Sequence, residues 1–290
     1  MFVYLNDGVV PEAEAMVSVF DHGFMYGDGI YETLRAYDGV VFRCEEHIQR
    51  LFRSASLIGL NMPKDIAGIK DAINETLRAN SLLNAYIRVT VSRGKGLIGL
   101  DPDLCETASF VIMTNNFKPY PAVFYEEGIK IIIAAVRRNL KEALDPRIKS
   151  LNFLNNILAK IEAKQAGAYE AVMLNSGGLI TEGTISNIFF ARDGVLCTPS
   201  VACGILDGIT RSLTLDLAVK NGLTVKEGEF RPEDLYGASE VFLTNTTMEV
   251  MPVSRVDETS YQPGKTAALL VREYGREVAA YVREKECERP

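Results

Sequence analysis

Two-residue turns between short apolar stretches constrain the fold of this 290-residue chain more than any other feature. Asp38-Gly39 separates ETLRAY from VVF, and Asp193-Gly194 separates NIFFAR from VLCTP. An Asp-Gly pair flanked by β-branched and aromatic residues indicates an antiparallel hairpin, because both turn residues readily adopt positive φ. Hairpins therefore dominate the expected connections, and we predict mixed α/β (α+β) sheets rather than a doubly wound parallel sheet.

Apolar residues at helical spacing predict helices around these strands. The predicted helices cover residues 44–59, 69–80, 153–167 and 209–222, with a closing helix from about residue 264. The segment 116–128 contains two prolines and little periodicity, which favours a linker. We therefore expect an N-terminal α/β domain at 1–115 and a C-terminal domain at 129–290.

The composition argues against several classes of function. Lysine and arginine number 31 against 38 aspartates and glutamates, a net charge of −7, so there is no basic surplus for binding nucleic acid or an anionic membrane. No apolar stretch is long enough to cross a bilayer and the chain does not start like a signal peptide, so we expect a cytoplasmic protein. Five cysteines without a CxxC pair and two histidines give no pattern for zinc or another metal.

The segment GKGLIG (94–99) matches the glycine pattern of dinucleotide-binding loops, but its context differs. That function requires a helix to begin at once, so that its first amides meet the pyrophosphate. Here the chain continues LDPDLCE, with a proline and no apolar helical period. We interpret the segment as a glycine-rich turn between two strands.

Three segments have residues suited to hold a phosphate. GILDGITRSL places Ile209 and Thr210 at a helix start, where unpaired amides and the helix dipole favour an anion. VFLTNTTMEV ends a strand in hydroxyl side chains, and HIQRLFRSA offers Arg50, whose guanidinium suits a dianion. Taken one at a time, each segment is explained more simply as a helix cap, a polar strand end or a solvated helix face.

Two further residues connect these segments to one cofactor. Lys149, in DPRIKSLNFLNN, lies at the edge of an apolar segment, where a lysine loses its proton more readily than in water and can form a Schiff base with a carbonyl. Glu182, in LITEGTISN, follows an apolar strand and could face a protonated ring nitrogen. A reactive lysine, a carboxylate and a phosphate site together indicate pyridoxal 5′-phosphate.

The order of several motifs resembles one family over essentially the whole chain. DHGFMYGDGIYETLRAYDG, HIQRL, AYIR, IKSLNFLNN, TEGTISN, GIT and FLTNTTMEVMPV are similar to the class IV, or fold-type IV, pyridoxal-phosphate aminotransferases. The resemblance implies a smaller N-terminal α/β domain and a larger C-terminal barrel-like domain. It also implies a homodimer or a higher homo-oligomer.

The resemblance implies a role for each matching position. Lys149 would carry the cofactor and move the proton at the substrate Cα, and Glu182 would pair with the ring nitrogen. The remaining implied positions are, for the phosphate, Arg50, Ile209, Thr210 and Thr246; against the ring, Leu196; and on the substrate side, Tyr31, Tyr86, Arg88 and Thr247.

The motifs as a whole are most similar to prokaryotic branched-chain aminotransferases, which implies transfer between an L-branched-chain amino acid and 2-oxoglutarate. Three departures from that group are Tyr31-Glu32-Thr33 in place of Phe-Glu-Gly, Phe153 in place of tyrosine, and Asn245-Thr246-Thr247-Met248 in place of Gly-Thr-Ala-Ala. Some of these residues resemble D-amino-acid aminotransferases, and the SRGxG stretch resembles 4-amino-4-deoxychorismate lyases, so both activities remain alternatives. Either Arg88 or Arg93 could meet the substrate carboxylate.

Overall fold

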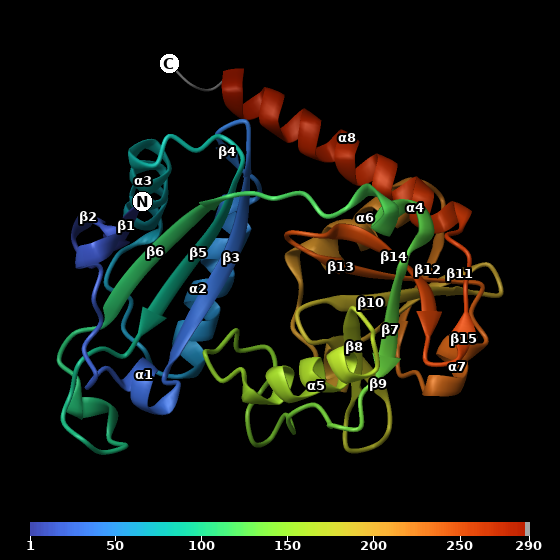
Figure 1. Ribbon diagram of the computed structural model, residues 1–290, viewed down its shortest axis with the longest axis horizontal. Helices are drawn as coiled ribbons and strands as arrows, with labels where there is room; N and C mark the ends of the chain where they lie inside the picture. Colours follow the sequence, from blue (N-terminus) through green and yellow to red (C-terminus); the bar gives the residue numbers. More distant parts are fainter. Residues whose placement is uncertain (288–290) are drawn as a thin grey trace. The chain divides into compact units, whose positions relative to one another are not determined.

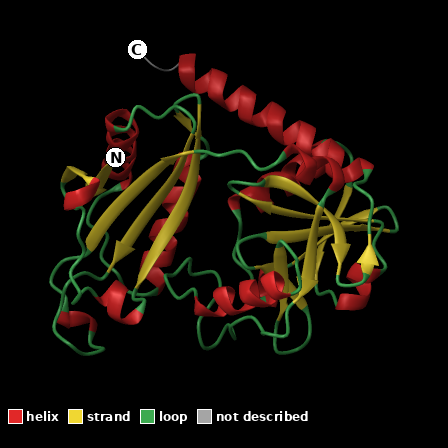
Figure 2. Ribbon diagram, viewed as in Figure 1, coloured by secondary structure: helices red, strands yellow, loops and turns green. Residues whose placement is uncertain are grey.

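The structure, a computed structural model, describes residues 1–287 and divides the chain into two compact units. Unit 1 comprises Met1–Lys118, Ile148–Asn152 and the C-terminal residues from Ala280, whereas unit 2 comprises Pro119–Arg147 and Phe153–Ala279. The lysine segment therefore folds with unit 1, although the chain on both sides of it belongs to unit 2. Figures 1 and 2 show the elements of each unit. The functional domain boundaries expected from the sequence stay a prediction, and the last three residues of the expected second domain lie outside the described residues.

Unit 1 is built on a six-stranded sheet in which every neighbouring pair is antiparallel. In spatial order its strands are β2 (Gly8–Pro11), β1 (Phe2–Leu5), β6 (Ser109–Asn116), β5 (Ala85–Ser92), β3 (Gly29–Tyr37) and β4 (Val40–Val41). The turn between β3 and β4 is the predicted Asp-Gly turn, with φ of 48° at Asp38 and 81° at Gly39. This prediction is confirmed.

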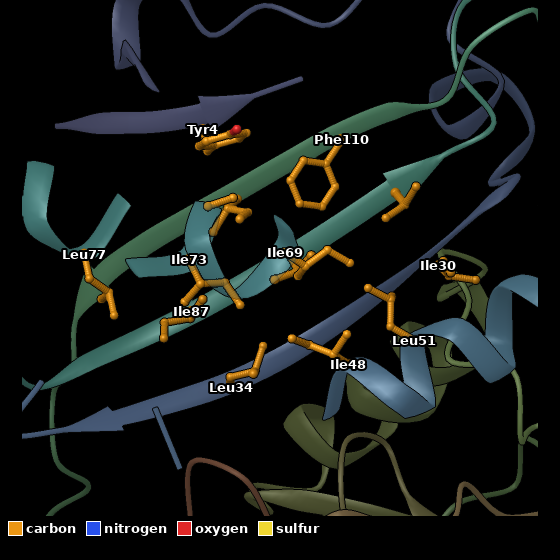
Figure 3. Packing of buried hydrophobic residues seen from close by; sticks show 14 of the residues in the cluster. Tyr4, Ile30, Leu34, Ile48, Leu51, Ile69, Ile73, Leu77, Ile87 and Phe110 are labelled. Atoms are coloured by element: carbon orange, nitrogen blue, oxygen red, sulfur yellow. The ribbon is translucent and has the colours of Figure 1, made fainter. Parts of the chain in front are cut away.

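Two amphipathic helices cover one face of this sheet. The helices of unit 1 are the short α1 (His22–Tyr26), α2 (Cys44–Leu57) and α3 (Ile66–Ala79). Figure 3 shows how Ile48 and Leu51 of α2, with Ile69 and Ile73 of α3, pack with Leu34 of β3 in one buried cluster. Burying each of these side chains stabilises the fold by about 1.5–3 kcal/mol.

The alternation of side chains along β3 assigns its residues to two faces. Ile30 and Leu34 belong to the buried cluster under the helices. Because side chains alternate along a strand, Glu32 lies on that same face, whereas Tyr31 and Thr33 lie on the opposite face. The same strand therefore supplies a carboxylate to the helix side and an aromatic ring to the other side.

Unit 2 contains a nine-stranded mixed sheet, as the hairpin signals and the resemblance predicted. In spatial order its strands are β12 (Thr224–Gly228), β11 (Val195–Pro199), β10 (Asn187–Arg192), β13 (Glu240–Asn245), β14 (Glu249–Val256), β7 (Ile129–Ile133), β8 (Glu170–Leu174) and β9 (Ile180–Gly183), with β15 (Thr259–Ser260) paired to β14. Three neighbouring pairs are parallel, β11 with β12, β14 with β7, and β7 with β8. The sheet curls until β9 lies near β10 and β11, which gives the barrel-like form expected for this part of the chain.

The helices of unit 2 connect and cover these strands. They are α4 (Ala122–Glu127), α5 (Leu154–Gln165), α6 (Ile209–Lys220), α7 (Pro232–Tyr236) and α8 (Lys265–Cys287), of which α8 continues into residues of unit 1. The predicted linker is not irregular throughout, because α4 folds within it after Pro121 and ends at Gly128, which has φ of 81°. Across residues 1–287, the helices are all too short or too polar to cross a membrane.

Candidate active site

Lys149 is held in place by its backbone, which adds a short extended segment to unit 1. The Lys149 carbonyl accepts a hydrogen bond from the Tyr31 amide (2.9 Å), and the Lys149 amide donates to Ser54 Oγ of α2 (3.1 Å). The next residues continue this pairing, since the Leu151 amide donates to the Gly29 carbonyl at 2.9 Å. A Cβ on Gly29 would lie 2.7 Å from the Leu151 side chain, so only glycine permits this close approach.

The Lys149 amine lies against an aromatic ring rather than a carboxylate. Its Nζ is 4.4 Å from the centroid of the Tyr31 ring, and the Arg88 guanidinium is 4.0 Å from the same centroid. Among the described residues, no aspartate or glutamate forms an ion pair with Lys149. The amine therefore lies beside a ring and without a carboxylate partner among the described residues, which suits a lysine that reacts with a carbonyl.

Arg50, the predicted phosphate ligand of unit 1, is buried in an ion pair with Glu32. Its Nε donates to Oε1 of Glu32 at 2.6 Å and its Nη2 to Oε2 at 2.9 Å, and the His47 ring nitrogen Nδ1 lies 2.8 Å from Oε2. These three residues are between 1% and 5% exposed. Glu32, which the sequence motif contained without an assigned role, thus orients the arginine.

Burial and charge act in opposite directions on the pKa values in this cluster. Burial alone would raise the pKa of Glu32, but the Arg50 charge and the His47 hydrogen bond hold it well below its usual value. Burial lowers the pKa of His47, although Glu32 opposes that shift. At neutral pH we therefore expect an ionised Glu32 and a neutral His47 that donates from Nδ1.

Glu182 is a buried carboxylate on β9 of unit 2, and hydrogen bonds fix both of its oxygens. Oε1 lies 3.0 Å from Nε and from Nη2 of Arg138. Oε2 accepts from the Leu206 amide at 2.9 Å and from Asn187 Nδ2 at 3.3 Å. A cation and a backbone amide hold this carboxylate in one orientation, as a partner for a protonated ring nitrogen requires.

Arg138 and the asparagines that orient it were not predicted from the sequence. Arg138 Nη1 donates to Asn155 Oδ1 at 3.2 Å and reaches Asn156 Oδ1 at 3.5 Å. Both asparagines lie in the first turn of α5, directly after the lysine segment. The signal for them was the Asn-Asn pair in an apolar helix start, because asparagine there is unfavourable unless its amide makes specific contacts.

The start of α6 and the end of β13 meet around Asn187 in unit 2. Asn187 pairs with Thr244 across β10 and β13, and its Nδ2 also donates to the Leu206 carbonyl at 3.0 Å. A Cβ on Gly208, the residue before α6, would lie 2.1 Å from Asn187 Oδ1. Two of the three predicted phosphate segments are thus close together, with Thr210 buried and Ile209 half-buried at the helix start.

The turn after β13 is held by the side chain of Asn245. Its Oδ1 accepts from the Thr247 amide (2.9 Å) and from the Met248 amide (2.8 Å). Thr247 Oγ1 lies 3.2 Å from the hydroxyl of Tyr120, a residue that sequence reasoning missed. The half-buried Thr246 completes this turn. The departure from the Gly-Thr-Ala-Ala pattern therefore has a structural consequence, since these two amides are already hydrogen-bonded within the turn.

The remaining predicted residues occupy different environments. Arg93 donates to both carboxylate oxygens of Asp28, at 2.5 and 3.0 Å, and to two backbone carbonyls, so it is a structural residue. Tyr86 lies two residues before Arg88 on β5, and so on the same face. Leu196 is 2% exposed on β11, and its role against a cofactor ring stays a prediction. The backbone of Leu206, which was not predicted, contacts both polar residues: its amide donates to Glu182 and its carbonyl accepts from Asn187.

Comparison with known proteins assigns this chain to a family. A model of the family described as amino-transferase class IV matches residues 29–256. Over 257 residues, the chain is 46% identical to a Methanocaldococcus jannaschii protein assigned as a branched-chain-amino-acid aminotransferase, covering 89% of this chain and 88% of that protein. It is also 35% identical to a D-alanine aminotransferase of Bacillus licheniformis (93% of each chain) and 32% identical to an aminodeoxychorismate lyase of Bacillus subtilis (98% and 97%).

Solved structures agree with this assignment. The branched-chain aminotransferase of Thermoproteus uzoniensis with norvaline superposes with a TM-score of 0.90 at 35% identity, covering 95% of this chain and 94% of that chain. The branched-chain amino acid aminotransferase of Thermobaculum terrenum, solved in its pyridoxal-phosphate form, gives a TM-score of 0.84 at 29% identity, covering 96% and 93%. Enzymes of this class use pyridoxal phosphate in general. The motifs, the fold and these comparisons together establish that the chain belongs to the class IV aminotransferases.

Proposed function

We propose that this enzyme transfers the amino group between an L-branched-chain amino acid and 2-oxoglutarate, with pyridoxal phosphate as its cofactor and the cytoplasm as its location. The observation that supports the proposal best is the environment of Lys149. Its backbone amide and carbonyl are both hydrogen-bonded, while its amine pairs with no carboxylate among the described residues. A lysine held this way serves a reaction rather than an ion pair.

The polar groups of unit 2 fit the two ends of pyridoxal phosphate. The N-terminus of α6 has no side-chain cap, and Thr244 Oγ1 is buried without a hydrogen-bond partner among the described residues. Unpaired donors at a helix start and a buried hydroxyl favour a phosphate, with Ile209, Thr210 and Thr246 as its proposed ligands. Glu182 offers a fixed carboxylate to the ring nitrogen.

The residues of this chain divide the work of the reaction. When bound, pyridoxal phosphate supplies an aldehyde that condenses with an amine and a ring that withdraws electrons from the substrate Cα. Lys149 Nζ binds the cofactor and then moves the proton to and from the substrate Cα. Glu182 holds the proton on the ring nitrogen, Leu196 packs against the ring, and Arg50 adds a fixed cation for the phosphate.

Arg88 is the proposed partner of the substrate carboxylate. Arg93 is committed to Asp28, and the amides of the turn after β13 are committed to Asn245. Arg88 instead stacks on Tyr31, the ring that also contacts the Lys149 amine. We therefore assign the substrate side to Tyr31, Arg88 and Tyr86 of unit 1, and we keep Thr247 as a further proposed substrate residue.

A homodimer is part of the proposal, because unit 1 has a large exposed apolar surface. Residues 16–26 and residues 97–100 form this surface. Two hydrogen bonds join the two segments, from the His22 ring to the Leu97 carbonyl (2.9 Å) and from the Gly99 amide to the Tyr26 hydroxyl (3.2 Å). The side chains that are at least 66% exposed there are Met16, Val19, Phe24, Leu97, Ile98 and Leu100. Contiguous apolar patches of this kind mark interfaces. We expect a second copy to cover the patch and Leu100→Glu to shift the sedimentation mass toward the monomer.

Absorption spectra of the holo-protein test the activity directly. We expect separate additions of L-leucine and of L-glutamate to convert the visible band of the bound cofactor, with 2-oxoglutarate restoring it. A response to D-alanine alone would replace the proposal with the D-amino-acid activity. A coloured protein that responds to none of the three, but releases pyruvate from aminodeoxychorismate, would identify the lyase.

Replacement of the lysine tests the observation on which the proposal depends. Lys149→Ala should abolish turnover and the covalent cofactor adduct that borohydride reduction traps for mass spectrometry, while circular dichroism stays native. Lys64→Ala is the matched control, since Lys64 Nζ lies 5.4 Å from the Tyr4 ring in the same unit and should leave both unchanged. Retained steady-state transamination in Lys149→Ala would reject the assignment.

A further inference from the structure

A second buried carboxylate of unit 2, Glu170 on β8, has no role in the function described so far. Its side chain is fully buried, at 0% exposure, on the face of the strand that also carries Val172 and Leu174 in the apolar interior of the sheet. Among residues 1–287, no lysine, arginine or histidine forms an ion pair with it. Burying a carboxylate without a cation is costly, so the hydrogen bonds it receives must be retained.

Those hydrogen bonds come mainly from one turn, the residues Thr184–Ser186. Glu170 Oε1 accepts from Thr184 Oγ1 at 2.5 Å and from the Thr184 amide at 3.2 Å, and Ser186 Oγ lies 3.4 Å from Oε2. Its own neighbour, the Ala171 amide, supplies one more at 2.9 Å. Four donors thus converge on a single carboxylate, which can accept about four.

The turn that Glu170 holds connects the two residues that define the cofactor-facing carboxylate. Glu182 is the second-last residue of β9, before the turn, and Asn187 begins β10 just after the turn. Asn187 Nδ2 donates back to Glu182. The Gly183 amide closes the turn on the Ser186 carbonyl at 2.7 Å. A Cβ on Gly183 would lie 2.2 Å from Ser186 Oγ, so the turn has no space for a larger residue.

The same turn is held from a second direction by Asn156 of α5. Asn156 Nδ2 donates to the Thr184 carbonyl at 2.7 Å, and Asn156 Oδ1 lies 3.5 Å from Nη1 of Arg138, the ion-pair partner of Glu182. The Thr184 hydroxyl and amide are therefore fixed by Glu170, and its carbonyl by Asn156. From Asn156 the contacts continue through Arg138 to the Glu182 carboxylate. From the turn they continue through Asn187, whose Nδ2 donates to the same carboxylate.

We propose that Glu170 is a positioning residue, which sets the direction of the Glu182 carboxylate through Thr184. The inference rests on the proposed function, in which Glu182 meets the ring nitrogen of pyridoxal phosphate. Glu170 touches neither substrate nor cofactor in this scheme. Its replacement changes the aim of Glu182 without removing any group that reacts.

The affinities for the cofactor and for one analogue of it report the orientation of the Glu182 carboxylate without any turnover. The apo-protein is titrated with pyridoxal phosphate and with its 1-deaza analogue, in which carbon replaces the ring nitrogen. The ratio of the two Kd values reports only the contact with the ring nitrogen. In the wild type we expect a preference for pyridoxal phosphate of about tenfold or more, the size of one hydrogen bond to a charged group.

Four variants then locate the origin of the preference. Glu170→Leu and Thr184→Val should bring the ratio of Kd values to within about threefold of one, because each removes one partner of the hydrogen bond that fixes the turn. Thr184→Ser keeps the hydroxyl and should keep the wild-type ratio. Thr181→Val is the matched control, since Thr181 Oγ1 donates to the Met173 carbonyl at 2.7 Å one residue before Glu182, and it should lower the melting temperature while keeping the ratio.

The outcomes separate this inference from the function on which it rests. A wild-type ratio near one would reject the contact of Glu182 with the ring and, with it, the inference. A wild-type preference that persists unchanged in Glu170→Leu and Thr184→Val would reject only the inference. If Glu170→Leu does not fold, the difference between Thr184→Val and Thr184→Ser decides the question alone.

Discussion

Each unit of this enzyme has a buried glutamate–arginine pair among the candidate functional residues, and the two pairs have opposite proposed roles. In unit 1, Arg50 is the proposed cofactor ligand and Glu32 supports it. In unit 2, Glu182 is the proposed ligand and Arg138 supports it. The residue types alone therefore do not reveal which partner acts on the cofactor.

The geometry of the two pairs is consistent with their different proposed roles. Arg50 engages both oxygens of Glu32, and His47 adds a contact to one of them, so that carboxylate is enclosed by its own unit. Glu182 gives only one oxygen to Arg138 and is aimed by a backbone amide at the other. We therefore expect Glu32, whose two oxygens are bonded within unit 1, to contribute to stability. We expect Glu182, which its partners hold in one orientation, to contribute to cofactor binding.

Glu32→Gln should produce the largest change in stability. Neutralising Glu32 leaves a buried guanidinium without its counter-charge, and breaking a buried pair in this way costs about 3–5 kcal/mol. Urea unfolding followed by circular dichroism measures the loss. Glu45→Gln is the control, because Glu45 pairs with Lys70 where both side chains are partly exposed, and its loss should cost much less stability. Equal losses in the two variants would contradict the assignment of Glu32 as the support of Arg50.

Glu182→Gln should show the reverse pattern, a smaller loss of stability and a large loss of rate. Arg138 keeps Asn155 and Asn156 as hydrogen-bond acceptors, so its environment is less disturbed. The variant can no longer hold a proton on the ring nitrogen, and we expect kcat to fall by about 10²-fold or more. Single-turnover kinetics with deuterated substrate show whether proton removal at Cα is the slowed step. An unchanged rate would place the functional carboxylate elsewhere.

The sequence predicted the members of each pair that carry a motif, but not their partners. Arg50 stands in a segment with helical periodicity and Glu182 follows an apolar strand, and both signals are local. Glu32 and Arg138 act across 18 and 44 positions of the chain, and such contacts depend on which strands and helices the fold places side by side. Glu170 and Tyr120 were missed for the same reason.

The architecture was more predictable than the site. The Asp38-Gly39 hairpin and the mixed sheet follow from turn chemistry and β-branched residues, both local properties. The short helix α4 was missed because two prolines hide its period, although Pro121 begins it and Gly128 ends it. The membership of residues 148–152 in unit 1 was also not predictable, since it depends on long-range contacts: backbone pairing with β3, the Ser54 hydroxyl, and the packing of Ile148 against the core of unit 1.

The smallest expected effect is a difference in acid sensitivity, because His47 belongs to the pair of unit 1 and no described histidine contacts Glu182 or Arg138. Burial lowers the pKa of His47 below its ordinary value of 6.5, so the unfolded chain binds this proton more readily than the folded one. The stability that the neutral His47 contributes is therefore complete above about pH 6.5, and it is lost as the pH falls below that value toward the lowered pKa of the folded protein. Glu32, whose pKa is also lowered, adds a second loss that begins only below about pH 4.5.

The loss of stability that comes from His47 is measured by urea unfolding between about pH 8 and about pH 5, on either side of the ordinary histidine pKa of about 6.5. His47→Gln keeps an N–H donor for Glu32 but does not titrate, so its stability should change less across this range than that of the wild type. Below about pH 4.5 both proteins should lose stability alike, because Glu32 remains in each. Parallel curves over the whole range would mean that His47 is not the acid-sensitive member, and that the two glutamate–arginine pairs do not differ in this respect.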